Sequence, residues 1–267
     1  MSPIAARFAG LKSKGDKALV LFVTAGDPAL DQLPEVLLAL QEGGADLIEV
    51  GIPFSDPIAD GPTIQASSQR ALDRGVTPRQ VLETLASVRL EVPVVLMGYL
   101  NPILRIGSER FADMAAKAGA SGTIVSDLTP EESDEWRDVS RRYGLDNVFL
   151  VAPTSTDERI QIAADRASGF VYAVSRTGVT GAQQSAPPEV ADLVGRIRAR
   201  TNLPVCVGFG ISTPEHVRMV CEVADGAVVG SWLVDFLATN WQNGVGQDKL
   251  IEAIRGLKAA TQQHSAG

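Results

Sequence analysis

The stretch Asp46-Leu-Ile-Glu-Val-Gly-Ile-Pro-Phe-Ser-Asp-Pro-Ile-Ala-Asp-Gly-Pro62 joins a short apolar run to a long proline-rich loop. The run ends at Gly51, and the prolines that follow it exclude a helix before Pro62. A helical pattern then covers Thr63 to Asp73. A strand, a loop and a helix in this order are the beginning of a βαβ unit, which predicts a parallel sheet.

Seven further apolar runs are built in the same way. The eight predicted strands are Ala18–Thr24, Asp46–Gly51, Val92–Gly98, Gly122–Ser126, Asn147–Ala152, Gly169–Ser175, Leu203–Gly208 and Gly226–Gly230. Because these runs are nearly continuous in Val, Ile and Leu, both faces of the sheet should be covered. Eight such strands in 267 residues, close to the roughly 250 of an eight-fold α/β barrel, predict that residues 1–267 form a single (β/α)8 TIM-barrel domain. The alternative is a two-domain, doubly wound sheet.

Helical patterns lie between the strands. They cover Leu33–Glu42, Arg79–Arg89, Glu109–Lys117, Glu131–Tyr143, Asp157–Ala164, Pro188–Arg200, Pro214–Val223 and Gln247–Gln262. Two helices fall outside the regular alternation: an extra N-terminal one near residues 5–12, and the helix Thr63–Asp73, inserted after the second strand. Chemistry in such a barrel belongs at the carboxyl ends of the strands and in the loops that follow them.

Composition points to a small-molecule ligand. The chain has 24 Lys and Arg against 32 Asp and Glu, a formal net charge of −8, which argues against a nucleic-acid partner or an anionic membrane surface. No apolar run approaches the roughly 20 residues that cross a bilayer, and no signal-peptide pattern opens the chain. Cys206 and Cys221 form no CxxC motif and are expected to be buried thiols. We therefore expect a cytoplasmic protein.

Glu49 stands inside an otherwise apolar strand. Removing an unpaired carboxylate from water costs several kcal/mol, so one interpretation is a buried ion pair or a side chain turned to solvent. The other is catalytic: an apolar pocket would raise the pKa of Glu49 toward neutrality, where one group can both give and take a proton. Asp60, in the following loop, is either a second acid/base group or a cap for the helix after Gly61.

Glycines mark a second candidate site in three loops. Gly178-Val-Thr-Gly181 follows the sixth strand, Gly208-Phe-Gly-Ile-Ser212 the seventh, and Gly230-Ser231 the eighth. Glycine lets backbone N–H groups approach an anion, and loops after the seventh and eighth strands often hold phosphate in this fold. Ser231 would add a hydroxyl and Arg176 a charge, although ordinary turn glycines and an exposed arginine would look the same.

Other cofactor chemistry finds little support. Only His216 and His264 are present, which makes a histidine metal site or a Ser-His-Asp triad improbable. Neither a P-loop nor a GxGxxG motif occurs, so we expect no metal and no organic cofactor. Phe22 and Tyr172 either form an aromatic wall at the mouth of the barrel or pack in its core.

The chain resembles the α subunit family of tryptophan synthase. The resemblance rests on Phe22-Val-Thr-Ala-Gly-Asp-Pro28, Glu49-Val-Gly-Ile-Pro-Phe-Ser-Asp-Pro-Ile-Ala-Asp-Gly-Pro62, Ser175-Arg-Thr-Gly-Val-Thr-Gly181 and Gly208-Phe-Gly-Ile-Ser212. It implies a lyase that cleaves indole-3-glycerol phosphate to indole and glyceraldehyde 3-phosphate without a cofactor of its own. Leu100 and Ile106 depart from the family, which places aromatic residues there.

The resemblance also implies residue roles and a partner. Glu49 matches the general acid/base, and Asp60 the carboxylate that holds the indole N–H. Residues that match the indole pocket are Phe22, Ile64 and Tyr172, and those that match the phosphate cradle are Gly181, Gly210, Gly230 and Ser231. A pyridoxal-phosphate β subunit would complete an α2β2 tetramer, with the loops 53–60 and 176–184 closing over the site. The rival hypotheses are a metal-dependent phosphate-sugar enzyme and a non-catalytic allosteric subunit.

Overall fold

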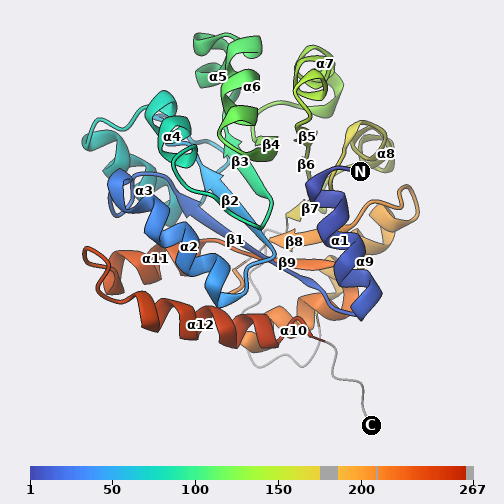
Figure 1. Ribbon diagram of the computed structural model, residues 1–267. Coiled ribbons are helices and arrows are strands. Elements are labelled where there is room, and N and C mark those ends of the chain that lie inside the picture. Colours follow the sequence, from blue (N-terminus) through green and yellow to red (C-terminus); the bar gives the residue numbers. More distant parts are fainter. Residues whose placement is uncertain (175–185, 209, 263–267) are drawn as a thin grey trace.

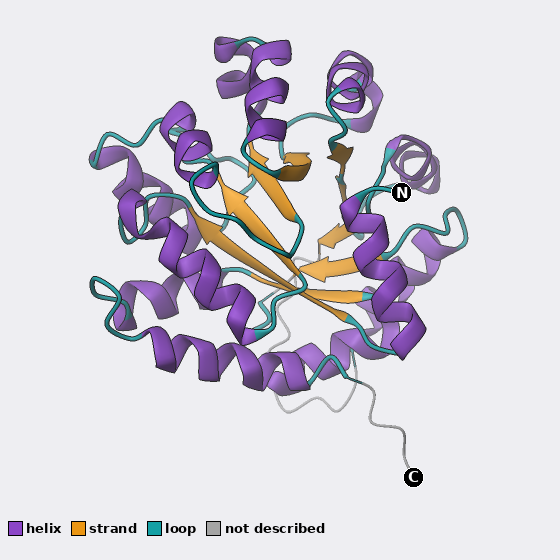
Figure 2. Ribbon diagram, viewed as in Figure 1, coloured by secondary structure: helices purple, strands orange, loops and turns teal. Residues whose placement is uncertain are grey.

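A computed structural model describes residues 1–174, 186–208 and 210–262, and the strands form one parallel sheet (Figures 1 and 2). The strands are β1 (Ala18–Thr24), β2 (Leu47–Gly51), β3 (Val94–Gly98), β4 (Ala120–Val125), β5 (Asp146–Asn147), β6 (Phe149–Val151), β7 (Val171–Val174), β8 (Val205–Gly208) and β9 (Gly226–Val229). Most of them are nearly all apolar, as strands covered on both faces require, and β5, which consists of Asp146 and Asn147, is the exception.

The sheet closes into a barrel through β5 and β6. Neighbouring strands run in the order β5-β4-β3-β2-β1-β9-β8-β7-β6, and Val148 alone separates the two end strands in the sequence. They are two pieces of the fifth barrel strand, predicted as one uninterrupted strand from Asn147. The (β/α)8 barrel is therefore confirmed, with an interruption at Val148, whose N–H donates to the carbonyl of Thr123 at 3.0 Å.

The strands are staggered as in other eight-stranded barrels of this class. Register partners followed from Phe22 through β2, β3 and β4 lead to Asp146. Partners followed the other way from Ala18 lead through β9, β8 and β7 to Leu150. Phe22 lies four residues beyond Ala18, and Leu150 four beyond Asp146, which gives the stagger of about eight expected for the fold. Inward side chains of alternate strands therefore lie at equal heights and form layers.

Helices surround the sheet (Figure 1). Their bounds are α1 (Pro3–Lys14), α2 (Leu33–Gly43), α3 (Pro62–Asp73), α4 (Pro78–Leu85), α5 (Leu100–Ile106), α6 (Ser108–Lys117), α7 (Asp134–Arg142), α8 (Asp157–Arg166), α9 (Pro188–Arg198), α10 (Pro214–Val223), α11 (Ser231–Asn240) and α12 (Gln247–Ala259), with short 3-10 turns η1 (Leu30–Gln32) and η2 (Pro130–Glu132). The extra helix α1 and the inserted helix α3 are confirmed. Helix α5, which contains Pro102, was not predicted.

Helix α1 covers the amino end of the barrel. Ile4, Phe8 and Leu11 are buried in the inner core cluster, together with side chains of the strands. The ring of Phe8 lies 5.9 Å from that of Phe170 at the start of β7. The helix begins at a Ser2 cap and ends at Gly15, which has a left-handed φ of 75°. One end of the barrel is thus closed, which leaves the carboxyl end for a ligand.

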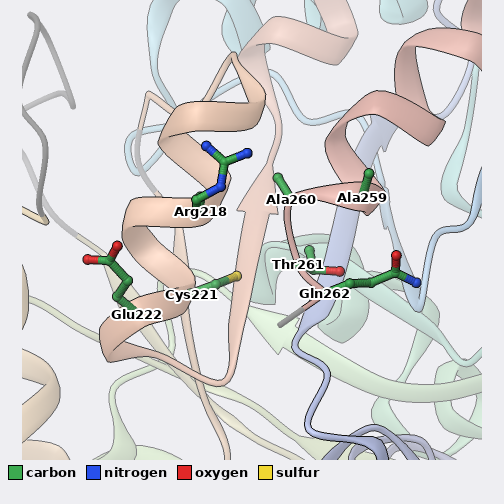
Figure 3. A pocket seen from close by; sticks show the side chains of 7 residues that line it. All are labelled: Arg218, Cys221, Glu222, Ala259, Ala260, Thr261 and Gln262. Carbon is green, nitrogen blue, oxygen red and sulfur yellow. The ribbon is translucent and has the colours of Figure 1, made fainter. Parts of the chain in front are cut away.

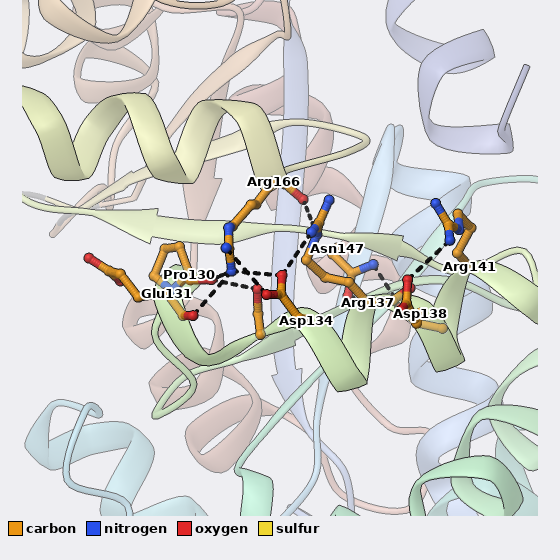
Figure 4. Close-up of polar contacts among 10 residues, drawn as sticks. Pro130, Glu131, Asp134, Arg137, Asp138, Arg141, Asn147 and Arg166 are labelled. Carbon is orange, nitrogen blue, oxygen red and sulfur yellow. Dashed lines mark hydrogen bonds and ion pairs between the residues drawn. The ribbon is translucent and has the colours of Figure 1, made fainter.

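Polar contacts fix some helices to one another. Arg166 of α8 donates to the carbonyl of Pro130 at 2.5 Å and pairs with Asp134 of α7 at 2.9 Å (Figure 4). Arg137 of α7 in turn donates to the carbonyl of Arg166 at 3.0 Å. The pattern over 131–143 had predicted one helix, but the chain there forms η2 and then α7, with Ser133 Oγ donating to the carbonyl of Pro130 at 2.7 Å.

Two further expectations concern the cysteines and the membrane. Cys206 and Cys221 are buried free thiols, as predicted. Within the described ranges, every helix is too short or too polar to cross a bilayer.

Candidate active site

Glu49 is a fully buried carboxyl group on β2. Its neighbours Ile48 and Val50 point outward into the helix-facing core, so strand alternation directs Glu49 into the barrel. Neither carboxylate oxygen has a hydrogen-bond partner among the described residues, so the buried ion pair considered from the sequence is not what the structure shows. Burial raises the pKa of Glu49 to about 8, because the charged form loses its hydration. The group is therefore protonated at neutral pH and suited to donate a proton.

Tyr172 shares a barrel layer with Glu49. The registers place these two residues, Ile124 and Val228 at one height, on the second, fourth, sixth and eighth barrel strands. Burial and the nearby charge of Glu49 raise the pKa of Tyr172 well above its usual value. Apart from the carboxyl group and the phenol, the layer is apolar, which accounts for the desolvation of Glu49.

Asp60 lies above this layer, in the loop between β2 and α3, where it is half-buried. It does not cap α3, because the helix begins after Gly61 without a side-chain cap. The Tyr99 hydroxyl instead donates to its carboxylate and accepts from the N–H of Ala59 at 3.1 Å. Burial raises the pKa of Asp60 to about 6, and the bond from Tyr99 opposes this shift. Asp60 is therefore mostly ionised at neutral pH, in contrast to Glu49.

Tyr99 was not among the predicted site residues. The residue follows β3 directly, and its ring stacks on Phe54 with centroids 5.0 Å apart. Asp127, after β4, accepts from the N–H of Leu100 at 2.8 Å and so fixes the start of α5 beside Tyr99. The position of Tyr99, two residues after the inward-facing Met97, was a signal present in the sequence, since side chains alternate along a strand.

Aromatic rings occupy space left by glycines. A Cβ at Gly51 would lie 2.6 Å from the ring of Phe22, and one at Gly208 would lie 2.2 Å from the hydroxyl of Tyr172. A Cβ at Gly230 would contact both Phe22 and Ile64, at 3.6 and 3.9 Å. The structure therefore brings Phe22, Ile64 and Gly230 together, while Tyr172 lies over β8. At the carboxyl end of the barrel, the Phe22 ring is buried and Tyr172 is partly buried.

Three of the predicted phosphate-site residues, Gly210, Gly230 and Ser231, fall within the described residues. Gly210 follows β8 with a left-handed φ of 52°, and Gly230 is the residue before α11, whose first residue is the exposed Ser231. The first turn of α11 contains no acidic residue, so its amino end can favour an anion. Gly181 and Arg176 lie outside the described residues.

In the described part of the chain, neither a metal site nor a further pocket adds to the candidate active site. Among the described residues, no group of three His, Cys, Asp or Glu side chains could hold a metal ion. His216 lies at the start of α10, 3.4 Å from Ser212, and His264 is outside the described part. A separate pocket lies between α10 and the end of α12, where Arg218 and Cys221 of one helix face the segment that contains Thr261 (Figure 3). It is not formed by the carboxyl ends of the strands.

Fold and site together define a (β/α)8-barrel enzyme with its site at the carboxyl end of the strands. The family model for the tryptophan synthase alpha chain matches residues 8–262. The tryptophan synthase alpha chains of Geobacter sp. (strain M21) and Citrifermentans bemidjiense are 49% and 50% identical, over 98% of this chain and 97% of each relative. The chain belongs to the tryptophan synthase alpha chain family, and it is a lyase of tryptophan biosynthesis that cleaves indole-3-glycerol phosphate.

Solved structures agree with this assignment. A structure of Mycobacterium tuberculosis tryptophan synthase matches with a TM-score of 0.90 at 36% identity, over 98% of this chain and 99% of the other. The alpha subunit from Legionella pneumophila matches with a TM-score of 0.89 at 36% identity, over 98% of each chain.

Proposed function

We propose that Glu49 is the general acid/base of the cleavage of indole-3-glycerol phosphate. The observation that carries this assignment is a fully buried carboxyl group, unpaired among the described residues, in the layer below the open carboxyl end of the barrel. Its raised pKa suits a group that first donates and then accepts a proton.

In this mechanism, protonated Glu49 donates its proton to indole C3, which leaves a positive charge shared with the ring nitrogen. The resulting carboxylate then removes the proton from the hydroxyl on the carbon attached to C3. As that oxygen forms the aldehyde carbonyl, the bond between C3 and this carbon breaks, and its electron pair restores the aromatic indole. Glu49 ends protonated, as it began, and the products are indole and glyceraldehyde 3-phosphate.

Asp60 holds the indole N–H in the same proposal. Its ionised carboxylate stabilises the positive charge that develops on the ring, an electrostatic effect that is strong in a buried site. Phe22, Ile64 and Tyr172 bind the indole ring, and the phosphate is held by Gly181, Gly210, Gly230 and Ser231. The contact of Phe22 and Ile64 with Gly230 supports a ring subsite that lies next to the phosphate subsite.

We further propose a tryptophan synthase β subunit with bound pyridoxal phosphate as the partner, in an α2β2 tetramer. Ile58 and Leu104 are large apolar side chains that are 83% and 55% exposed, and both lie in segments that follow β2 and β3. Exposed apolar groups at the mouth of the site are suited to an interface. We also propose that residues 1–267 form one domain, because the described strands belong to a single sheet. We propose a cytoplasmic location, since free thiols need no oxidising compartment.

The test is indole release from indole-3-glycerol phosphate by the purified chain, with and without the cognate β subunit, beside the Glu49→Gln variant. We expect turnover that the β subunit stimulates and that the variant loses. Absence of turnover in every arm, with the β reaction still stimulated, would instead support the non-catalytic subunit.

A further inference from the structure

At the carboxyl end of the barrel, Ser126 is a second residue with a buried side-chain oxygen that has no hydrogen-bond partner in the described part of the chain. Among the described residues, buried side-chain oxygens without a hydrogen bond belong to only three residues: Glu49, Ser126 and Asp146. Asp146 lies at the other end, beside Gly169 and Ile4 under α1. An unpaired buried hydroxyl is costly in a native structure and calls for an explanation.

Strand alternation directs the Ser126 side chain into the barrel. Thr123 points outward, where its hydroxyl accepts from the indole N–H of Trp136 at 3.2 Å, and Val125 belongs to the outer core. Ile124 belongs to the inner core. The Ser126 N–H still donates to the carbonyl of Gly98 at 2.8 Å, which continues the ladder between β3 and β4. Ser126 is therefore the next inward position after Ile124.

The layer that contains Ser126 lies directly above the layer of Glu49. The registers place Glu49, Ile124, Tyr172 and Val228 at one height. The residues two positions further along each of these strands therefore also share one height. These are Gly51, Ser126, Val174 and Gly230. Two of the four have no side chain, and Ser126 has the only polar one. A substrate that reaches Glu49 from the open end must pass through this layer and lie beside Ser126.

The aromatic end of the substrate fits this side of the mouth. Ser126 is on the fourth barrel strand, opposite Gly230 on the eighth, where the phosphate is placed in the proposed function. Asp60, which holds the indole N–H in that proposal, is bonded to Tyr99 at the end of β3, the strand next to β4. An indole ring whose N–H is hydrogen-bonded to Asp60, and which is directed away from the phosphate, therefore has its six-membered ring near Ser126.

We propose that Ser126 determines which aromatic rings the site accepts, by offering a hydrogen bond to a polar substituent on the six-membered ring. This inference rests on the proposed function. Plain indole has one polar atom, the N–H assigned to Asp60, and leaves the hydroxyl of Ser126 unpaired. A hydroxyl or amino group on the ring would pair with it. The site thus takes hydroxyindoles and aminoindoles as a substrate class.

The test uses the reverse condensation, in which C3 of an indole adds to the aldehyde carbon of glyceraldehyde 3-phosphate and the carbonyl oxygen gains the proton that C3 loses. Indole and the 4-, 5-, 6- and 7-hydroxyindoles are compared in the wild-type protein, in Ser126→Ala and in Ser121→Ala. Ser121 is a matched control, since it is on the same strand at the amino end of the barrel. Ring electronics cancel when each ring is compared between proteins.

For at least one hydroxyindole, Ser126→Ala should lower the ratio of its kcat/KM to that of indole by about three- to ten-fold, the effect of one neutral hydrogen bond. Ser121→Ala should leave the ratio unchanged. A ratio that Ser126→Ala does not change for any of the four rings, while plain indole is condensed normally, overturns the role of Ser126 and leaves the lyase assignment intact. Failure of the wild-type protein to condense indole at all overturns both.

Discussion

Phe22 and Glu49 are register partners on β1 and β2, and both side chains point into the barrel. The carboxyl group is therefore flanked by an aromatic ring, while Val95, its register partner on β3, is apolar. Neither neighbour offers a hydrogen bond that could replace those of water, so the protonated form of Glu49 is favoured over the carboxylate. The chemistry proposed for Glu49 therefore follows from its position in the barrel.

Glu49→Gln should lower kcat for indole release by about 100- to 10,000-fold, the loss typical of a general acid/base group. KM should change much less, because the amide keeps the shape of the side chain. Steady-state kinetics of indole release measure both quantities. Glu83→Gln is the control, because Glu83 is exposed and pairs with Arg79 on the surface of α4 at 2.8 Å. Parity of the Glu49 variant with the wild type would refute the assignment.

The dependence of kcat/KM on pH should be bell-shaped. Asp60 must be ionised to stabilise the ring charge, so activity rises with pH through its pKa of about 6. Glu49 must be protonated to act first as an acid, so activity falls as pH rises through about 8. Because kcat/KM reports the free protein, a profile from pH 5 to 9 should show both limbs. A profile that is still rising at pH 9 would contradict the protonated starting state.

Tyr99→Phe should move the acid limb of that profile to higher pH. The lost hydroxyl is the donor that lowers the pKa of Asp60, so burial alone would then set this pKa. Activity at pH 6 should fall by several-fold more than activity at pH 7.5, while the alkaline limb from Glu49 stays in place. A uniform loss at every pH would mean that Tyr99 only holds the loop in shape.

Ser231→Asp should raise KM for indole-3-glycerol phosphate by about ten-fold or more, because a carboxylate at the amino end of α11 would repel the phosphate. Ser231→Ala is the matched control and should cost only the few-fold effect of one hydrogen bond. Binding of inorganic phosphate, followed by calorimetry, should weaken in parallel. An unchanged KM in the Asp variant would remove Ser231 from the phosphate site.

Asp27→Ala should destabilise the fold by about 1–3 kcal/mol, since the buried carboxylate accepts two hydrogen bonds from an arginine. The effect stays in this range because the arginine is half-exposed to water. Arg70 of α3 donates these bonds at 3.0 and 2.6 Å, and the Asp27 side chain is 5% exposed. Urea unfolding measures the change. Asp113→Ala removes a surface pair with Lys117 at 2.7 Å and should change the free energy of unfolding by less than about 0.5 kcal/mol.

The barrel could be predicted because each strand carries its own signal. The run Ala18–Thr24 is apolar at every position except the last, and its bounds were predicted as the structure has them. The interruption at Val148 could not be predicted, because it depends on how β4 and β7 approach the same segment from two sides. Helix α5 was missed because Pro102 in its first turn resembles a loop signal, although proline is tolerated there.

The site could be predicted where a residue differs in polarity from its neighbours in the sequence. Glu49 is a charged residue in an apolar strand, and this contradiction is visible without coordinates. Tyr99 and Ser126 resemble ordinary strand-end residues, and their importance comes from partners far away in the sequence, or from the lack of one. The close approach of the Tyr172 hydroxyl to Gly208 is likewise a relation across two strands, which no local pattern encodes.

Helix α1 has a consequence for synthesis on the ribosome. It is the first helix to be made, yet Phe8 packs on Phe170, and Ile4 lies in a cluster that includes Cys206 and Val228. At roughly 5–20 residues per second, the nascent chain carries these apolar side chains without their final partners for on the order of ten seconds or more. The packing of α1 on β7, β8 and β9 therefore belongs to the late steps of barrel formation.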